Sequence, residues 1–352
     1  MKAGKLPGVV EERSVFMFTG GRGMEPAEVA RGTGADGRFM AAATDQTGIF
    51  GTEQTQALRV GMLFDRVCAK LAAQGARAEV FNASLSLPPA ASEASLKKLA
   101  ALVAQAAKCR DITAYSVHVQ TRYEPEGGAG AVQLVLTGAG SAKGAEDFPG
   151  ILGYALSRAG DLKPDPSGRT PLKLPAGDNA LSVVMAGYAA LEATAVLISE
   201  KQESLSGRLA ASYLAQGLKK ASRTDVREAA RIAAQAGALA KIAGEGGVFG
   251  ALWEIGEYFD CGMDIILRDI LLLQETIEVC EILDVNPYLL ASGGCLLAVT
   301  GDAQALLARY RDAGIAAAAI GILKEGRDRV IHNEWEERFL EPFRAEELYR
   351  VL

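Results

Sequence analysis

Residues Gly244–Glu254 place a run of glycines directly before an apolar segment that should form a helix. Glycines at a helix start leave backbone N–H groups free, and these groups together with the helix dipole can bind an anion such as phosphate. The turn that contains Glu245, Gly246 and Gly247 is therefore a candidate phosphate-binding site. A tight packing turn requires the same glycines and is the alternative interpretation.

A second glycine-rich segment, Gly32–Gly37, has the spacing G-x-G-x-x-G. A dinucleotide site requires a strand before this motif and a helix after it. Here a polar stretch precedes the motif, and the strand-like Arg38–Ala43 follows it. The context argues against a dinucleotide site, which leaves a plain loop or a phosphate-facing loop of another kind.

His118 lies between two valines in a strand-like segment that we expect to be buried. A hydrogen-bonded core histidine is the ordinary interpretation there, and a catalytic histidine is the alternative. The chain has only two histidines and five scattered cysteines without a C-x-x-C, which argues against a zinc site and a disulfide framework. Motifs of P-loop ATPases, serine hydrolases and zinc proteases do not occur.

The charge and the hydropathy of the chain argue against several classes of protein. The 352 residues carry 37 basic and 43 acidic side chains, a net charge of −6, so we expect neither a nucleic-acid nor a membrane partner. No apolar stretch approaches the roughly 18 residues of a membrane span, and Met1–Ser14 is too polar for a signal peptide. We expect a cytoplasmic protein.

Strand-like and helix-like segments alternate along the chain, which predicts an α+β fold. Helical spacing occurs at Leu58–Gln74, after Ser92 as an N-cap, and in a block at Leu205–Ala243. The proline-rich stretch Asp161–Pro175 predicts a linker, and hence domains at 1–165 and 166–352. The predicted strands are Ala78–Leu87, Ile112–Gln120, Ala131–Thr137, Asn179–Ala186, Cys295–Thr300 and Ile315–Leu323.

Several segments, in a consistent order along nearly the whole chain, resemble the AIR synthase-related (PurM-like) superfamily. Within it, the similarity is closest to the branch that contains the hydrogenase-maturation protein HypE. The glycine turn before the helix is the most specific of these segments. The segments are Lys5–Pro7, Arg13–Val15, Gly244–Glu254, Asn286–Tyr288, Ser292–Gly294 and Arg338–Pro342.

The resemblance implies two domains: an N-terminal half whose strands form a β-barrel across a homodimer, and a C-terminal α+β half. It also implies ATP in the groove between the halves, Mg²⁺ held by carboxylates, and transfer of a phosphoryl group to a small acceptor. In such a site Mg²⁺ offsets the repulsion between phosphates, and the glycine turn binds phosphate oxygens.

Carried over by position, the resemblance gives a mixed set of site residues. Gly34 and Asp36 match the family's glycine–acid loop, and Asp45 matches its next metal-facing aspartate. The family's Asn-Asp pair falls on Ala69 and Lys70, so an ammonium replaces a carboxylate that would bind metal. His118 is kept near the expected acceptor, where the family has a Gly-Gly-His-Thr-Glu strand end, but the glutamate of that motif is Gln120 here.

These exchanges remove about three units of negative charge from the expected metal site, so ordinary Mg²⁺ binding should fail. The first hypothesis is therefore a homodimer with an altered or non-catalytic nucleotide site, which binds a nucleotide or another small molecule rather than acting as an Mg·ATP-dependent enzyme. In a variant of this hypothesis, the Lys70 ammonium stands where a metal would be and pairs with a phosphate without Mg²⁺. The second is an active ATP-dependent enzyme that uses Asp36 and Asp45 for metal and His118 near the acceptor. A scaffolding role is not separable from the first hypothesis by sequence.

Two further expectations concern Lys70 and the C-terminal end. Lys70 could instead belong to an exposed basic stripe with Arg59, Arg66 and Arg77 on the first helix. The chain ends at Leu352 without the cysteine that the HypE branch uses for carbamoyl transfer, so that reaction is not expected.

Overall fold

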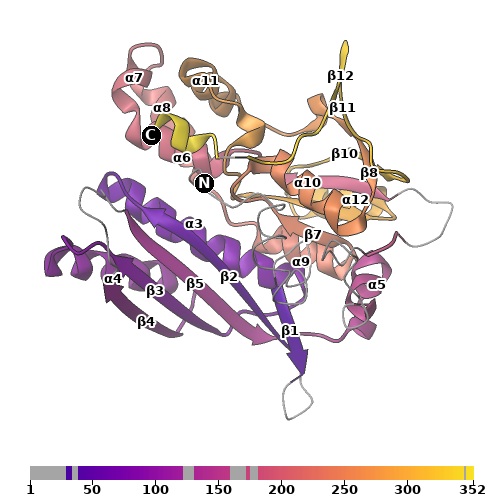
Figure 1. Ribbon diagram of the computed structural model, residues 1–352, viewed down its shortest axis with the longest axis horizontal. Helices are drawn as coiled ribbons and strands as arrows, with labels where there is room; N and C mark the ends of the chain where they lie inside the picture. The colour runs from indigo at the N-terminus through magenta and orange to yellow at the C-terminus, as the bar shows by residue number, and fades with distance from the viewer. Residues whose placement is uncertain (1–28, 34–38, 122–130, 159–171, 175–180, 345) are drawn as a thin grey trace.

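The computed structural model describes residues 29–33, 39–121, 131–158, 172–174, 181–344 and 346–352. Within them the N-terminal half forms one mixed sheet covered by helices on one face, and the C-terminal half forms a second mixed sheet covered on both faces (Figure 1). The predicted α+β architecture is confirmed. The predicted domain boundary at residue 165 lies outside the described residues.

The first sheet has the strand order β1-β2-β5-β3-β4. β3 and β4 are parallel and are joined by α4 (Glu93–Lys108), which begins after the predicted N-cap Ser92. The other neighbouring strands are antiparallel. The strands are β1 (Val29–Thr33), β2 (Phe39–Ile49), β3 (Val80–Leu87), β4 (Ala114–Thr121) and β5 (Val132–Ser141).

The first two residues of the G-x-G-x-x-G segment, Gly32 and Thr33, end β1, which pairs with β2 in antiparallel register from Val29 opposite Ala43 to Thr33 opposite Phe39. The expectation that no strand precedes this segment is wrong. A strand also follows it in place of a helix, so the dinucleotide interpretation is excluded by topology.

Helix α3 (Glu53–Ala73) covers the inner face of this sheet. The Thr52 side chain caps its start by accepting a hydrogen bond from the Thr55 backbone N–H at 3.3 Å. The predicted apolar face is confirmed, because each of its five side chains is buried in the core, where burial contributes roughly 1.5–3 kcal/mol per large side chain. These side chains are Val60, Leu63, Phe64, Val67 and Leu71.

The second sheet has the order β12-β11-β8-β10-β6-β9-β7. Helix α10 (Gly247–Phe259) packs on one face, and α9 (Arg227–Gln235) and α12 (Ala303–Asp312) pack on the other. Its strands are β6 (Ser182–Gly187), β7 (Leu239–Ile242), β8 (Gly262–Ile266), β9 (Cys295–Thr300), β10 (Ala317–Lys324), β11 (Arg329–Asn333) and β12 (Glu336–Phe339).

A separate helical layer lies beside this sheet, around α6. The predicted helical block Leu205–Ala243 is correct for its helices but wrong at its end, where β7 enters the sheet. None of the described helices has the length and apolar character of a membrane span. The remaining helices are α5 (Gly150–Arg158), α6 (Leu191–Glu200), α7 (Gln202–Ser206), α8 (Ala211–Ala221), α11 (Gln274–Leu283) and α13 (Leu348–Val351).

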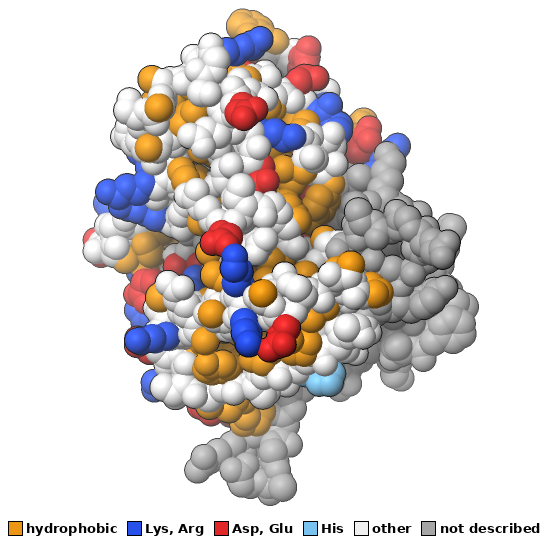
Figure 2. Space-filling view, turned by 90° about the vertical axis from the view of Figure 1, so that its left-hand side faces the viewer, with side chains coloured by type: hydrophobic (Ala, Val, Ile, Leu, Met, Phe, Trp, Pro, Cys, Tyr) orange, Lys and Arg blue, Asp and Glu red, His pale blue; other side chains and the backbone are white. Residues whose placement is uncertain are grey.

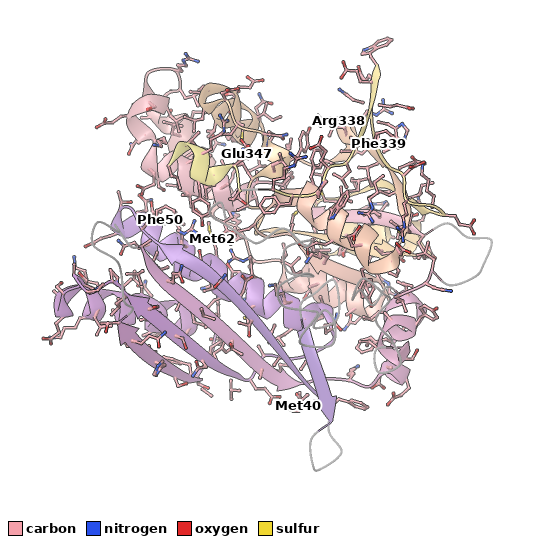
Figure 3. All side chains as sticks on the ribbon, viewed as in Figure 1. Met40, Phe50, Met62, Arg338, Phe339 and Glu347 are labelled. Carbon is pink, nitrogen blue, oxygen red and sulfur yellow. The ribbon has the colours of Figure 1, made fainter. Side chains whose placement is uncertain are left out.

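The two halves meet along α3, which packs against α6 and α9 of the C-terminal half. Met62 is buried against Leu191 and Ala195, and Figure 3 shows it on the side of α3 that faces that half. Ala69 and Ala73 pack into the core beneath α9, and their small side chains permit the close approach of the two helices. Helix α3 is therefore shared by both halves and can carry side chains into the space between them.

The outer face of the first sheet has no helix on it in the described part of the chain. Along β3, residues alternate between a buried inner set, such as Phe81 and Ala83, and an outer set that includes Val80 and Asn82. On another face of the molecule, shown in Figure 2, acidic and basic side chains are interspersed among hydrophobic ones.

Candidate functional site

Lys70 and Asp45 form an ion pair between α3 and β2, with Nζ 2.9 Å from Oδ2. Asp45 lies on the inner face of its strand, in the same alternation as the buried Ala43 and Thr47. The Lys70 side chain is only 6% exposed, and its ammonium also lies 3.5 Å from the Thr44 carbonyl oxygen. The pair is thus enclosed between sheet and helix.

Arg66 lies one turn before Lys70 and contacts the same carboxylate, with Nε 3.0 Å from Oδ2 of Asp45. Its Nη1 donates to both carboxylate oxygens of Glu192 on α6, each at 2.6 Å, so the guanidinium joins the two halves of the chain. Burial alone would lower the pKa of Arg66, but the carboxylates of Asp45 and Glu192 raise it well above its usual value. Arg66 therefore stays charged.

Arg59 is the third cation on this side of α3 and is 2% exposed. Its Nη2 donates to Thr47 Oγ1 at 2.7 Å and to the Tyr349 hydroxyl at 3.3 Å, and its guanidinium lies 4.4 Å from the centre of the Phe50 ring. Its Nη1 is buried and has no hydrogen-bond partner among the described residues. Arg59, Arg66 and Lys70 are all buried, so the alternative that they form an exposed basic stripe with Arg77 is wrong. Of these four residues only Arg77 is exposed, and it lies beyond the end of the helix.

The glycine turn adopts the conformation that its composition predicts. Gly246 and Gly247 have φ of 86° and 66°, which glycine adopts without strain, and α10 begins there. The backbone N–H of Gly246 donates to Oε2 of Glu346 at 2.7 Å, and the N–H of Ala291 donates to Oε1 at 2.8 Å. A carboxylate of the chain itself therefore occupies the donor that sequence assigns to phosphate.

Burial raises the pKa of Glu346 to about 8, although these backbone N–H groups act in the opposite direction. Burial also raises the pKa of Glu245. The carboxylates of Glu192 and Asp45 raise this pKa further, whereas the guanidinium groups of Arg66 and Arg59 lower it. The Tyr349 hydroxyl donates to Oε1 of Glu245 at 3.3 Å. Glu245 thus belongs to the same electrostatic cluster as the side chains on α3.

The structure brings together some of the predicted site residues. Asp45, Lys70 and the Glu245–Gly247 turn belong to one region between the halves. Gly34 and Asp36 lie outside the described residues. Within the described ranges, no group of three or more His, Cys, Asp or Glu side chains is arranged to hold a metal ion.

His118 is not part of this cluster. It is exposed, which corrects the expectation of a buried strand. It pairs in register with Ser84, two residues beyond Asn82 on the outer face of the sheet, whereas Asp45 faces inward toward α3. Its catalytic role stays a prediction.

Sequence reasoning did not assign site roles to Arg59, Arg66, Glu192, Glu346 or Tyr349. Spacing could have identified Arg66, because a residue four positions before Lys70 lies on the same side of a helix. No local pattern signals Glu346, which reaches a turn 100 residues away through the folding of the C-terminal segment.

No protein-family model matches this sequence, nor does any curated protein sequence. Solved structures match its fold along most of the chain. HypE of E. coli is 17% identical, with 89% of this chain and 88% of that chain covered and a TM-score of 0.60.

A HypE in complex with ATP is also 17% identical, with coverages of 89% and 87% and a TM-score of 0.63. The complex of AaThiL with AMPPCP and TMP is 10% identical, with coverages of 96% and 98% and a TM-score of 0.65. At these identities the likeness shows the fold alone, and the PurM-like, two-domain fold predicted from sequence is confirmed.

Proposed function

We propose that this protein is a PurM-like homodimer that binds a nucleotide or another phosphate compound without Mg²⁺, through an altered version of the site between its halves. The observation that carries the proposal is the position of Lys70 and Arg66, whose nitrogens lie 2.9 and 3.0 Å from one oxygen of Asp45. Two fixed cations at that distance oppose a divalent ion on the same oxygen. The residues present therefore do not fit a magnesium ion bound at Asp45.

Arg59 supports an anionic ligand in this region. Its Nη1 is a buried N–H donor without a partner in the described residues, and a buried unpaired donor costs about 1–3 kcal/mol. A phosphate oxygen would satisfy this donor. The fold neighbours support the choice of ligand class, because one HypE structure holds ATP and the AaThiL structure holds AMPPCP.

Calorimetric titration of the purified protein with ATP, in EDTA and then in excess Mg²⁺, tests the proposal. We expect binding that survives EDTA and weakens at least tenfold in Lys70→Ala, because that ammonium takes part in neutralising the phosphates. Lys219→Ala, which removes an exposed lysine of α8, is the matched control and should bind as the wild type does. Binding that requires Mg²⁺, or no binding in either condition, would overturn the proposal.

An ATP-dependent phosphoryl-transfer enzyme acting on an amide-type or other small substrate is the second candidate. The observation in its favour is that the carboxylates of Asp45 and Glu192 both lie close enough to Glu245 to raise the pKa of its carboxyl group. Hydrolysis or transfer that needs Mg²⁺ and is lost in Asp45→Asn would favour this enzyme over the binding protein.

The homodimer is proposed on the outer face of the first sheet. Val80 on that face is half exposed, and the strands there present small and polar side chains, among them Asn82, Thr137 and His118. Closing two such sheets against each other would give the barrel that the resemblance implies and would protect the exposed edge of β4.

A further inference from the structure

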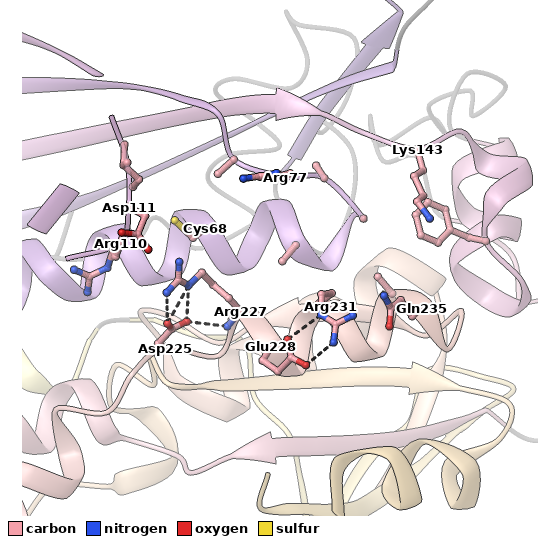
Figure 4. A pocket seen from close by; sticks show the side chains of 17 residues that line it. Cys68, Arg77, Arg110, Asp111, Lys143, Asp225, Arg227, Glu228, Arg231 and Gln235 are labelled. Carbon is pink, nitrogen blue, oxygen red and sulfur yellow. Dashed lines mark hydrogen bonds and ion pairs between the residues drawn. The ribbon is translucent and has the colours of Figure 1, made fainter. Parts of the chain in front are cut away.

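A cavity of about 620 Å³ lies between the C-terminal part of α3 and helix α9 (Figure 4). Its lining comes from both halves of the chain: Cys68 and Ala72 on α3, the turn that follows α3, and Arg227 and Arg231 on α9. Its volume falls within the roughly 300–1,000 Å³ of pockets that bind small organic molecules.

This cavity is separate from the cluster around Lys70. Residues on a helix advance by about 100° each, so Cys68 and Ala72 project from α3 on a side different from that of Arg66 and Lys70. The ion pairs of Arg66 and Lys70 run to Asp45 and Glu192, and none of these four residues lines the cavity.

Much of the inner lining is apolar. It consists of alanine side chains together with Ile112 and Phe148. Cys68 adds to this apolar character, since burial raises the pKa of its thiol to about 11 and keeps it neutral. Such a lining favours a ligand with an apolar body.

The charged groups around the cavity are mainly basic. Five cations, Arg77, Arg110, Lys143, Arg227 and Arg231, accompany three carboxylates, Asp111, Asp225 and Glu228, so the lining is net positive in a chain of net charge −6.

Three of the cations are held by carboxylates. Arg227 pairs with Asp225 at 2.6 Å, Arg231 with Glu228 at 2.5 Å, and Arg110 with Asp65 at 2.6 Å. Arg77 lines the cavity and is exposed, and no acidic side chain pairs with it in the described part of the chain. Its guanidinium can bind a carboxylate or phosphate by donating two parallel hydrogen bonds.

We propose that this cavity binds a small organic anion, with its apolar body against Ile112, Phe148 and the alanines and its carboxylate or phosphate against Arg77. Because α3 passes between this cavity and the Asp45 cluster, an occupant would contact the helix that carries Lys70. The proposal does not depend on what the Lys70 region binds.

Titrations of the full chain with four probes test the proposal: 1-naphthyl phosphate, 1-naphthoate, neutral 1-naphthol and inorganic phosphate. We expect one site, and affinity for at least one of the two naphthyl anions that exceeds that for naphthol and for phosphate by at least tenfold. The comparison of the two anions identifies the preferred head group. The proposal would be overturned if naphthol or inorganic phosphate bound as tightly as the naphthyl anions, or if inorganic phosphate were the one probe that bound.

Arg77→Glu should weaken the naphthyl anion at least tenfold and leave naphthol binding unchanged, because only the charged contact is lost. Arg208→Glu changes another exposed arginine, outside the cavity, and should have no effect. Ala72→Phe, which fills the cavity from α3, should weaken both naphthyl anions and naphthol, provided that thermal unfolding shows a folded protein. Unchanged anion binding in Arg77→Glu, or an equal loss in Arg208→Glu, would place the probe elsewhere and contradict the assignment.

Discussion

The carboxylate of Glu346 lies at the N-terminal end of α10, where its Oε2 accepts the backbone N–H of Gly246 at 2.7 Å. Phe343, three residues earlier, packs so closely on the same turn that a Cβ on Gly246 would lie 2.9 Å from its ring. The C-terminal segment therefore covers the glycine turn with both an apolar group and a buried carboxyl group. Any phosphate that uses the Gly246 N–H must displace Glu346.

The burial of Glu346 predicts a pH dependence of stability. Its pKa is raised from 4.5 to about 8, so between these pH values the folded chain holds a proton that the unfolded chain has lost. Stability should therefore fall as pH rises through this window, by up to about 1.4 kcal/mol per pH unit from this group. Glu346→Gln should flatten that dependence, measured by urea unfolding at several pH values.

Glu347→Gln is the matched control, because the neighbouring glutamate pairs with Arg350 at the surface and does not contact the turn. It should keep the slope of the wild type. An equal slope in wild type and Glu346→Gln would show that this carboxyl group ionises normally in the folded chain.

Introducing a carboxylate at position 70 should create a response to metal. In Lys70→Asp a second carboxylate would face Asp45, and the repulsion between them would be relieved by a divalent cation. We expect millimolar Mg²⁺ to raise the melting temperature of Lys70→Asp by several degrees, and to leave the wild type unchanged. Lys70→Asn, which removes the cation without adding a carboxylate, should respond less; an equal response in both variants would argue against metal binding at this position.

The sequence predicted the elements whose signals are local. The apolar spacing of Val60, Leu63 and Phe64 identified α3, and the aliphatic runs identified β3, β6 and β9 within a few residues. Strand β1 was missed because its five residues, VARGT, show no alternation of apolar and polar side chains, and β7 because its four residues follow a helical pattern.

The candidate site was predicted less completely, for a physical reason. Lys70 could be placed beside Asp45 because the resemblance aligned both positions. The direction of a side chain depends on tertiary packing, so sequence could not distinguish a buried Lys70 from an exposed one, and it placed His118 in the core although that residue is exposed. The contacts of Arg66 with Glu192 and of Glu346 with Gly246 join distant segments and leave no periodic signal.

The glycine turn should not tolerate a side chain at Gly247. A Cβ there would lie 2.4 Å from the Tyr288 carbonyl oxygen, and φ is +66°. Gly314→Ala is a matched control, because φ is +69° but no atom lies within 4 Å of the added Cβ. We expect Gly314→Ala to cost about 1–2 kcal/mol from backbone strain alone, and Gly247→Ala to cost clearly more, in chemical unfolding. Equal losses would mean that the turn can shift away from Tyr288.

The proposed dimer predicts different outcomes for two exposed valines on adjacent strands. Val80 lies on the outer face of the first sheet, whereas Val117 pairs in register with the inward-facing Ala83 and so points to the opposite face. They are 50% and 38% exposed, respectively. A glutamate at position 80 would bring like charges together across a two-fold interface on the outer face, so Val80→Glu should shift the protein from dimer to monomer in size-exclusion chromatography with light scattering. Val117→Glu should remain dimeric. If Val80→Glu is still a dimer, or if the wild type is a monomer, the outer face is not the interface of a homodimer.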